Sequence, residues 1–164
     1  MQKAKNYGIT VAGIVILALA VLIIFLTIFV PQARENKILK ERADLLLNAE
    51  YERMMLFDPL REREGSFADR GAEVMLLSEQ AAALRERFGE VMAAGVRNKE
   101  NVSKLEGAWD TKWQIRTPEN AICNLYFTKD ALYFYAQGTA FYFEPKDMLA
   151  YDAFYALLQQ MLEN

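Results

Sequence analysis

The sequence predicts an α+β protein: a single N-terminal transmembrane helix, a long α-helical hairpin, and a small antiparallel sheet of about four strands packed by a C-terminal helix. Three observations lead to this fold class. The stretch between Lys5 and Arg34 is uncharged and mostly apolar, apolar residues then recur at helical spacing, and from Gly107 they recur at every second position. We expect a short tail over 1–6, the membrane helix over 7–31, a hairpin or coiled-coil-like stalk over 32–100, and an α+β domain over 105–164.

The first element is the membrane helix. Between Ile9 and Val30 the chain consists mostly of Ile, Leu, Val, Ala and Phe, and a bilayer core needs about 20 such residues in a helix. A cleaved signal peptide has only about 7–15 and ends in small residues, unlike the segment Phe29-Val30-Pro31-Gln32-Ala33. We therefore expect an uncleaved anchor in the lipid bilayer, with Pro31 kinking or ending the helix.

The charges around this helix bear on its orientation. Lys3 and Lys5 precede it, which favours a cytoplasmic tail and an external domain. Basic residues also follow it closely and count against this orientation, whereas Glu35 and Glu41 carry little weight in the rule. These basic residues are Arg34, Lys37, Lys40 and Arg42. We expect the tail to be the retained end, which places the chain in the inner (cytoplasmic) membrane with a periplasmic or other extracytoplasmic domain.

Small residues recur along one side of the membrane helix. Gly13, Ala20 and Thr27 are spaced by seven positions and share one helix face. Small residues allow transmembrane helices to approach closely, so this face is a candidate packing surface for another helix. The alternative is that an apolar run of this length contains small residues by chance.

The hairpin is expected to begin with a helix from Arg34 to Phe57, followed by a turn at Asp58-Pro59 and a capping signal at Ser66 and Asp69. The apolar stripe of this first helix is Leu39, Ala43, Leu46, Leu47, Met54 and Phe57.

The second helix of the hairpin shows a sustained heptad spacing and is expected to end near Gly95. This stripe suits either a partner helix at a stalk interface or the core of its own domain. Its residues are Val74, Leu77, Ala81, Leu84, Phe88 and Val91.

Alternating residues then predict a meander of strands over 109–116, 121–127, 132–137 and 140–144. A helix with a 3.6-residue stripe follows, formed by Tyr151, Phe154, Tyr155, Leu158, Met161 and Leu162. We expect it to cover an apolar sheet face formed by Trp109, Trp113, Leu125, Phe127, Leu132, Phe134, Phe141 and Phe143. Cys123 is expected to pack in this core.

The opposite sheet face carries tyrosines at alternating positions, namely Tyr126, Tyr133, Tyr135 and Tyr142. Tyrosine combines apolar area with a polar tip and is enriched at interfaces, which makes this face a candidate docking surface for a partner or for the hairpin. The alternative is the ordinary preference of aromatic residues for strands.

Composition argues against several classes of function. The chain contains no His and one Cys, so the commonest general base, the usual zinc ligands and Cys-based clusters are missing. Its formal net charge is −3, and removing Lys3 and Lys5 leaves −5 on the remainder, which disfavours nucleic-acid binding. We expect no catalytic residues, no metal and no cofactor.

One short segment resembles a known family. Leu105-Glu106-Gly107-Ala108-Trp109 is similar to the Gly-x-Trp opening of lipocalin-like barrels, and the resemblance implies ligand binding inside a barrel. Such a barrel needs about eight strands, whereas the remaining sequence has room for about four.

These observations lead to two expected functions. The first is a non-enzymatic single-pass subunit that scaffolds or stabilises a larger membrane complex, with other membrane protein subunits or further copies of itself as partners. The alternative is a membrane-tethered ligand-binding or sensing module with a pocket between the sheet and the last helix.

Overall fold

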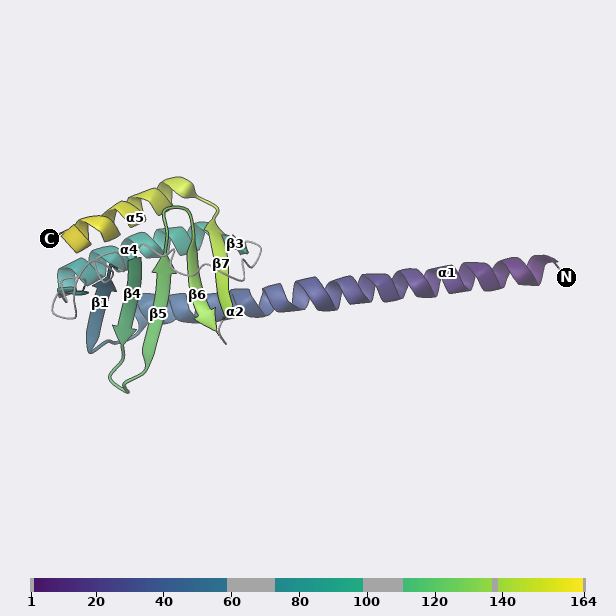
Figure 1. Cartoon of the computed structure of the whole chain (residues 1–164), viewed down its shortest axis with the longest axis horizontal. Helices are drawn as coiled ribbons and strands as arrows, with labels where there is room; N and C mark the ends of the chain where they lie inside the picture. Colours follow the sequence, from purple (N-terminus) through teal and green to yellow (C-terminus); the bar gives the residue numbers. More distant parts are fainter. Residues whose placement is uncertain (1, 59–72, 99–110, 137–138, 164) are drawn as a thin grey trace. The chain divides into compact units, whose positions relative to one another are not determined.

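The computed structural model describes the chain except for residues 1, 59–72, 99–110, 137–138 and 164, and its elements are shown in Figure 1. The contacts divide the chain into two compact units, residues 1–38 and residues 39–164. The lipocalin-like segment 105–109, including Trp109, lies outside the described residues, and so does the capping signal at Ser66 and Asp69.

The N-terminal part is helical from its second residue onward. Helix α1 (Gln2–Ile24) leads into a π-helical turn, η1 (Phe25–Phe29), and then into helix α2 (Val30–Asn48). Among the residues whose side chains are described, this helical run is the one that is long enough and apolar enough to cross a membrane. The mean hydropathy of its most apolar stretch is 3.2.

Of the two expected effects of Pro31, a kink or an end of the helix, the second does not occur, because the helix continues past Pro31. A proline ring normally clashes with the carbonyl four residues before it. Here the wider π turn precedes the proline, with the Val30 N–H bonded to the Phe25 carbonyl oxygen five residues back. The Thr27 hydroxyl also donates to the Ile23 carbonyl oxygen at 2.7 Å.

The predicted helical hairpin is wrong. Helix α2 ends at Asn48, and the segments expected to be helical contain strand β1 (Arg53–Phe57) and strand β2 (Glu73–Met75). Within the described part of the second predicted helix, the segment Ser78–Ala94 is helical and forms α4, and strand β3 (Val96–Asn98) follows it.

The error has a physical reason in the short apolar run at Met54 to Phe57. A run of four apolar residues suits a helix or a strand equally, so periodicity alone does not decide between them. Pairing with β4 decides it, since Leu56 lies opposite Trp113 in antiparallel register and both side chains are completely buried. Within the predicted first helix, Glu50 had already interrupted the apolar stripe.

The four predicted meander strands are present, but they form the middle of a larger sheet. All seven strands pair antiparallel, in the order β2-β1-β4-β5-β6-β7-β3. The meander strands are β4 (Thr111–Arg116), β5 (Ile122–Phe127), β6 (Leu132–Ala136) and β7 (Thr139–Pro145).

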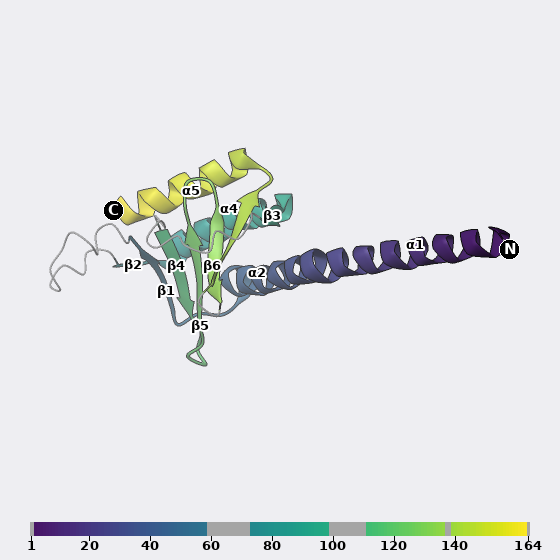
Figure 2. The ribbon, with the colours of Figure 1, turned by 45° about the vertical axis from the view of Figure 1, so that its right-hand side comes forward.

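One face of the sheet is covered by helices (Figures 1 and 2). The register places Trp113, Phe127 and Phe134 on the same face. The ring of Phe88 from α4 lies 5.4 Å from that of Trp113, and the guanidinium of Arg42 from α2 lies 5.1 Å from that of Phe134. The C-terminal half of α2, α4 and the last helix, α5 (Met148–Glu163), therefore pack on this face.

The apolar core predicted from the sequence is confirmed at its described positions. Trp113, Leu125, Phe127, Leu132, Phe134 and Phe143 are completely buried, Phe141 is half-buried and Cys123 is buried. The stripe of the last helix is also confirmed, since Tyr151, Phe154, Leu158, Met161 and Leu162 are buried and Tyr155 is half-buried.

Two glycines explain how α4 packs and ends. A Cβ built on Gly89 would lie 3.9 Å from Cδ2 of Leu47, so the Leu47 side chain of α2 packs over this position of α4. Gly95 ends the helix as expected and has a φ of +91°, a conformation that side chains disfavour. Its carbonyl oxygen accepts a hydrogen bond from the Lys146 N–H at 3.0 Å.

Candidate interaction surface

The four tyrosines singled out in the sequence do share one face of the sheet, which we call the tyrosine face. Tyr126, Tyr133 and Tyr142 form one row across β5, β6 and β7 because they are direct register partners, and Tyr135 lies in the next row. Tyr133 stacks on Tyr142 with ring centroids 4.6 Å apart and on Tyr126 at 5.1 Å. Tyr135 meets Tyr126 edge-on at 5.1 Å.

The four side chains differ in exposure. Tyr133 and Tyr142 are buried and belong to a second, smaller apolar cluster with Ala131 and Ala140. Tyr126 is half-buried against that cluster, whereas Tyr135 is 37% exposed. Tyr133 and Tyr142 therefore act as packing residues, and Tyr135 is the member that presents its ring to solvent.

The chemistry of these hydroxyls follows from their surroundings. The Tyr133 and Tyr142 hydroxyls are buried. Burial raises the pKa of Tyr126, Tyr133 and Tyr142 above the usual tyrosine value of about 10. These hydroxyls therefore stay protonated at physiological pH.

One further apolar side chain on this face is well exposed. Ile122, at the start of β5, is 53% exposed and lies on the same face as Asn124 and Tyr126. Asn124 is held by the Gln114 side-chain amide, which donates to its Oδ1 at 2.8 Å. Ile122 and Tyr135 are thus the two described positions of β5 and β6 where the face offers large apolar side chains to a partner.

The sheet is incompletely closed between β5 and β6. Their ladder pairs only Tyr126 with Tyr133 and Phe127 with Leu132. By contrast, β4 and β5 are paired over six positions and β6 and β7 over five. The two central strands are therefore joined at one end and separate along the rest of their described length.

Arg42 from α2 fills this gap. Continued antiparallel register would place Leu125 opposite Phe134 and then Asn124 opposite Tyr135, the next hydrogen-bonded pair after Tyr126 and Tyr133. Instead, Nη1 of Arg42 donates to the Asn124 carbonyl oxygen at 3.1 Å and Nη2 donates to the Tyr135 carbonyl oxygen at 3.4 Å. In the sequence, Arg42 stands out only as one of the basic residues that follow the apolar run. The one sequence feature that could have indicated its role is its place next to the apolar stripe of the same helix, whose members Leu39, Ala43 and Leu46 are buried.

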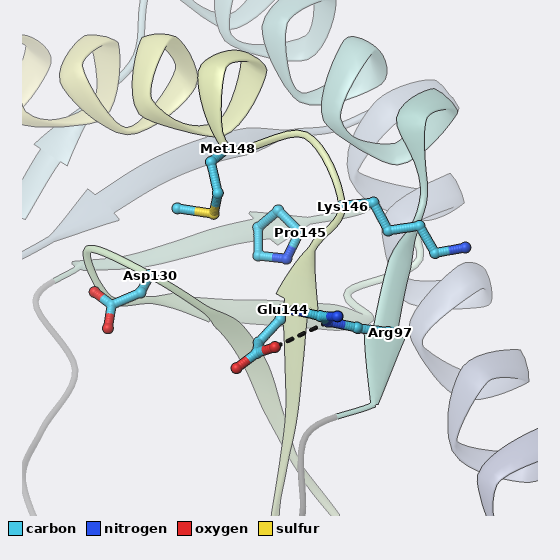
Figure 3. A pocket seen from close by; sticks show the side chains of 6 residues that line it. All are labelled: Arg97, Asp130, Glu144, Pro145, Lys146 and Met148. Carbon is cyan, nitrogen blue, oxygen red and sulfur yellow. Dashed lines mark hydrogen bonds and ion pairs between the residues drawn. The ribbon is translucent and has the colours of Figure 1, made fainter.

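A hollow of about 400 Å³ lies near the start of α5 (Figure 3). Within it, Arg97 Nε bonds Glu144 Oε2 at 3.0 Å, and the Lys146 side chain points away from this pair. The Arg97 side chain is 69% exposed, so the ion pair contributes little free energy. The lining residues, Arg97, Asp130, Glu144, Pro145, Lys146 and Met148, do not converge on a common point.

The space between the sheet and α5, where a ligand pocket was the alternative expectation, is occupied by aromatic rings. Phe154 of α5 lies 5.1 Å from Phe127, 5.2 Å from Phe88 and 6.3 Å from Trp113, measured between ring centroids. The described residues therefore form a packed core at this place, not a cavity.

The residues predicted for a stalk interface lie within the domain. Ala81, Leu84, Phe88 and Val91 are buried in the core under the sheet. Val74 belongs to β2 and is half-buried. Leu77, just before α4, is 71% exposed. The heptad spacing of α4 thus corresponds to an amphipathic helix that covers its own domain.

The residues predicted for membrane-helix packing lie on the exposed surface of the N-terminal helical run. Gly13, Ala20 and Thr27 are all exposed, and a Cβ built on Gly13 would meet no atom within 4 Å. Thr27 directs its hydroxyl to the carbonyl oxygen of its own helix, at Ile23. Packing of this face against another helix remains a prediction.

Cys123 is the one described thiol, and it lies inside the domain. The Cys123 thiol is buried, burial raises its pKa, and Sγ lies 3.6 Å from the Arg42 carbonyl oxygen as a weak donor. Across the described ranges, no three His, Cys, Asp or Glu side chains are grouped closely enough to hold a metal ion.

Comparison with known proteins adds no assignment, since no protein-family model, curated protein or solved structure matches this chain.

Proposed function

We propose that this chain is a non-enzymatic, single-pass membrane subunit that stabilises a larger membrane protein complex. The observation that carries the proposal is the two-faced sheet attached to an apolar helix. The three described helices of the domain cover one face, while the opposite face holds ordered, stacked tyrosines with Tyr135 and Ile122 exposed.

The partner is a protein surface that combines apolar area with hydrogen-bonding groups. A tyrosine ring gives large contact area at low conformational cost, and its hydroxyl hydrogen-bonds at the rim. The small cluster beneath it, including the fully buried Tyr133, holds the exposed Tyr135 ring in place through an edge-on contact at 5.6 Å. A preorganised aromatic ring loses little entropy on binding.

The apolar helix supplies the second contact. Its length and composition suit a membrane span, and the lysines at positions 3 and 5 favour a cytoplasmic tail. The domain then lies on the outer side of the inner membrane. In this setting the face containing Gly13, Ala20 and Thr27 packs against a neighbouring transmembrane helix of the complex.

The test is purification of the full tagged chain from its own membranes in mild detergent, followed by mass analysis of the bound proteins. We expect stoichiometric membrane protein partners with the wild-type chain. The double variant Tyr135→Ser with Ile122→Ser should lose at least about tenfold of the bound partner, because contact residues of this kind cost more than about 1 kcal/mol each.

The matched control is Leu149→Ser, which removes another exposed apolar side chain, 83% exposed, from α5. It should leave partner recovery unchanged. Recovery of the wild-type chain alone would overturn the proposal. So would equal partner loss in the control, because the tyrosine face would then have no specific role.

A further inference from the structure

Arg42 links a helix on one face of the sheet to residues of the opposite face. Its guanidinium enters the gap between β5 and β6 and bonds the carbonyl oxygens of Asn124 and Tyr135, whose side chains belong to the tyrosine face. The same guanidinium lies over the Phe134 ring at 5.1 Å, on the helix-covered face. One side chain therefore contacts the helix-covered face and the backbone of two strands that carry the tyrosine face.

The gap has two arrangements that satisfy its carbonyl groups. With Arg42 in place, the two carbonyl oxygens accept charged N–H donors and the strands stay apart. Without it, the existing register allows the ladder to continue, so that the Tyr135 N–H bonds the Asn124 carbonyl oxygen. Backbone groups require partners, and these two solutions exclude each other.

The position of Arg42 is set by α2. Leu39, Ala43 and Leu46 of this helix are buried in the domain, and the Arg42 carbonyl oxygen also contacts Sγ of Cys123 on β5. The helix begins at Val30, directly after the apolar helical run. A displacement of α2 along its axis or about it therefore moves the guanidinium relative to β5 and β6.

We propose that Arg42 couples the position of α2 to the tyrosine face: with the guanidinium inserted the gap is open, and on its withdrawal the β5–β6 ladder closes and repositions Tyr126 and Tyr135. This inference rests on the proposed function for the identity of the face as a binding surface. It adds a regulatory step, in which movement of the anchor helix changes how the exposed Tyr135 ring is presented to the partner.

Hydrogen exchange of the full chain in lipid nanodiscs tests the first half of this coupling. We expect Arg42→Met to slow exchange of the Tyr135 amide by roughly fivefold, the protection that one backbone hydrogen bond of ordinary net strength provides. Arg42→Lys, which keeps one charged donor, should lie between this variant and the wild type. Lys40→Met, an exposed change on the same helix, should have no effect.

Two results would overturn the proposal that the β5–β6 ladder closes when Arg42 withdraws. One is an unchanged Tyr135 exchange rate in Arg42→Met. The other is faster exchange over all strands together, which would make Arg42 only a general stabiliser of the fold. If Arg42→Met does not fold, the milder Arg42→Lys decides the question by the same comparison.

Bilayers of different thickness test the link to the membrane helix. Nanodiscs of dimyristoyl- and dieicosenoyl-phosphatidylcholine impose different hydrophobic mismatch on a spanning helix and so change its tilt or depth. We expect the Tyr135 exchange rate of the wild type to differ by about threefold between them, and that of Arg42→Met to be the same in both. Equal wild-type rates, or an equal response in Arg42→Met, would refute the coupling.

These measurements need no partner protein. A partner that fails to bind would refute the proposed function while leaving the exchange result intact, so the two failures are distinguishable.

Discussion

Replacing Phe154 with alanine probes the aromatic core that joins α4, α5 and the sheet. Phe154 is completely buried, and its ring lies within 6.3 Å of four other rings, measured between centroids. A buried phenylalanine truncated to alanine typically costs about 3–5 kcal/mol. We expect a value of about 4 kcal/mol here, because rings from three separate elements surround the site and cannot all collapse into the space left behind.

The matched control is Phe141→Ala, which removes the same side chain from a half-buried position on β7. Its stacking on Phe134 at 5.3 Å predicts a loss of about 1–2 kcal/mol. The assay is urea unfolding of the full chain in mild detergent, followed by tryptophan fluorescence, with the free energy of unfolding extrapolated to zero denaturant. A loss below about 1 kcal/mol for Phe154→Ala, or a larger loss for Phe141→Ala, would refute the core described above.

Two further predictions concern the glycines of α4 and the buried tyrosines. Gly89→Ala should stabilise the domain by up to about 1 kcal/mol, because the added Cβ meets Leu47 only at ordinary contact distance and alanine favours a helix. Gly95→Ala should destabilise it by about 1 kcal/mol, because φ is +91° there. Thermal unfolding measures both variants, and a shift of the unfolding temperature in the same direction for both would contradict the argument. The raised pKa of Tyr126, Tyr133 and Tyr142 means that the folded state keeps these protons where the unfolded chain releases them. Their contribution to stability is complete below the unfolded pKa of about 10 and is lost as pH rises above it, so the unfolding temperature should fall from pH 9 to 11, and a rise over that interval would contradict the assignment.

The meander and last helix could be predicted from the sequence because their large apolar residues recur with the period of a strand or of a helix. Alternation in β4 to β7 and the 3.6-residue stripe of α5 depend on nearby residues only, and both appear in the structure where the pattern indicated them. The shared face of the four tyrosines follows from the same period of two, since alternate residues of a strand point to one side.

Local spacing of apolar residues could not exclude the predicted helical hairpin. Met54 to Phe57 and the segment around Val74 are short apolar runs. The first run pairs with β4, which is distant in the sequence, and the second pairs with β1, which belongs to the other helix of the predicted hairpin. Strand formation there depends on hydrogen bonds to those partners, which no local spacing records.

The sequence by itself determined the apolar N-terminal helix, the amphipathic elements and the alternation that separates the aromatic core from the tyrosine face. These follow from side-chain transfer free energies and from the fixed periods of helix and strand. Only the tertiary structure decided which tyrosines are buried, that α4 covers its own sheet, and that Arg42 lies between β5 and β6. Each of these depends on contacts between residues distant in the chain, whose energies are absent until the elements pack together.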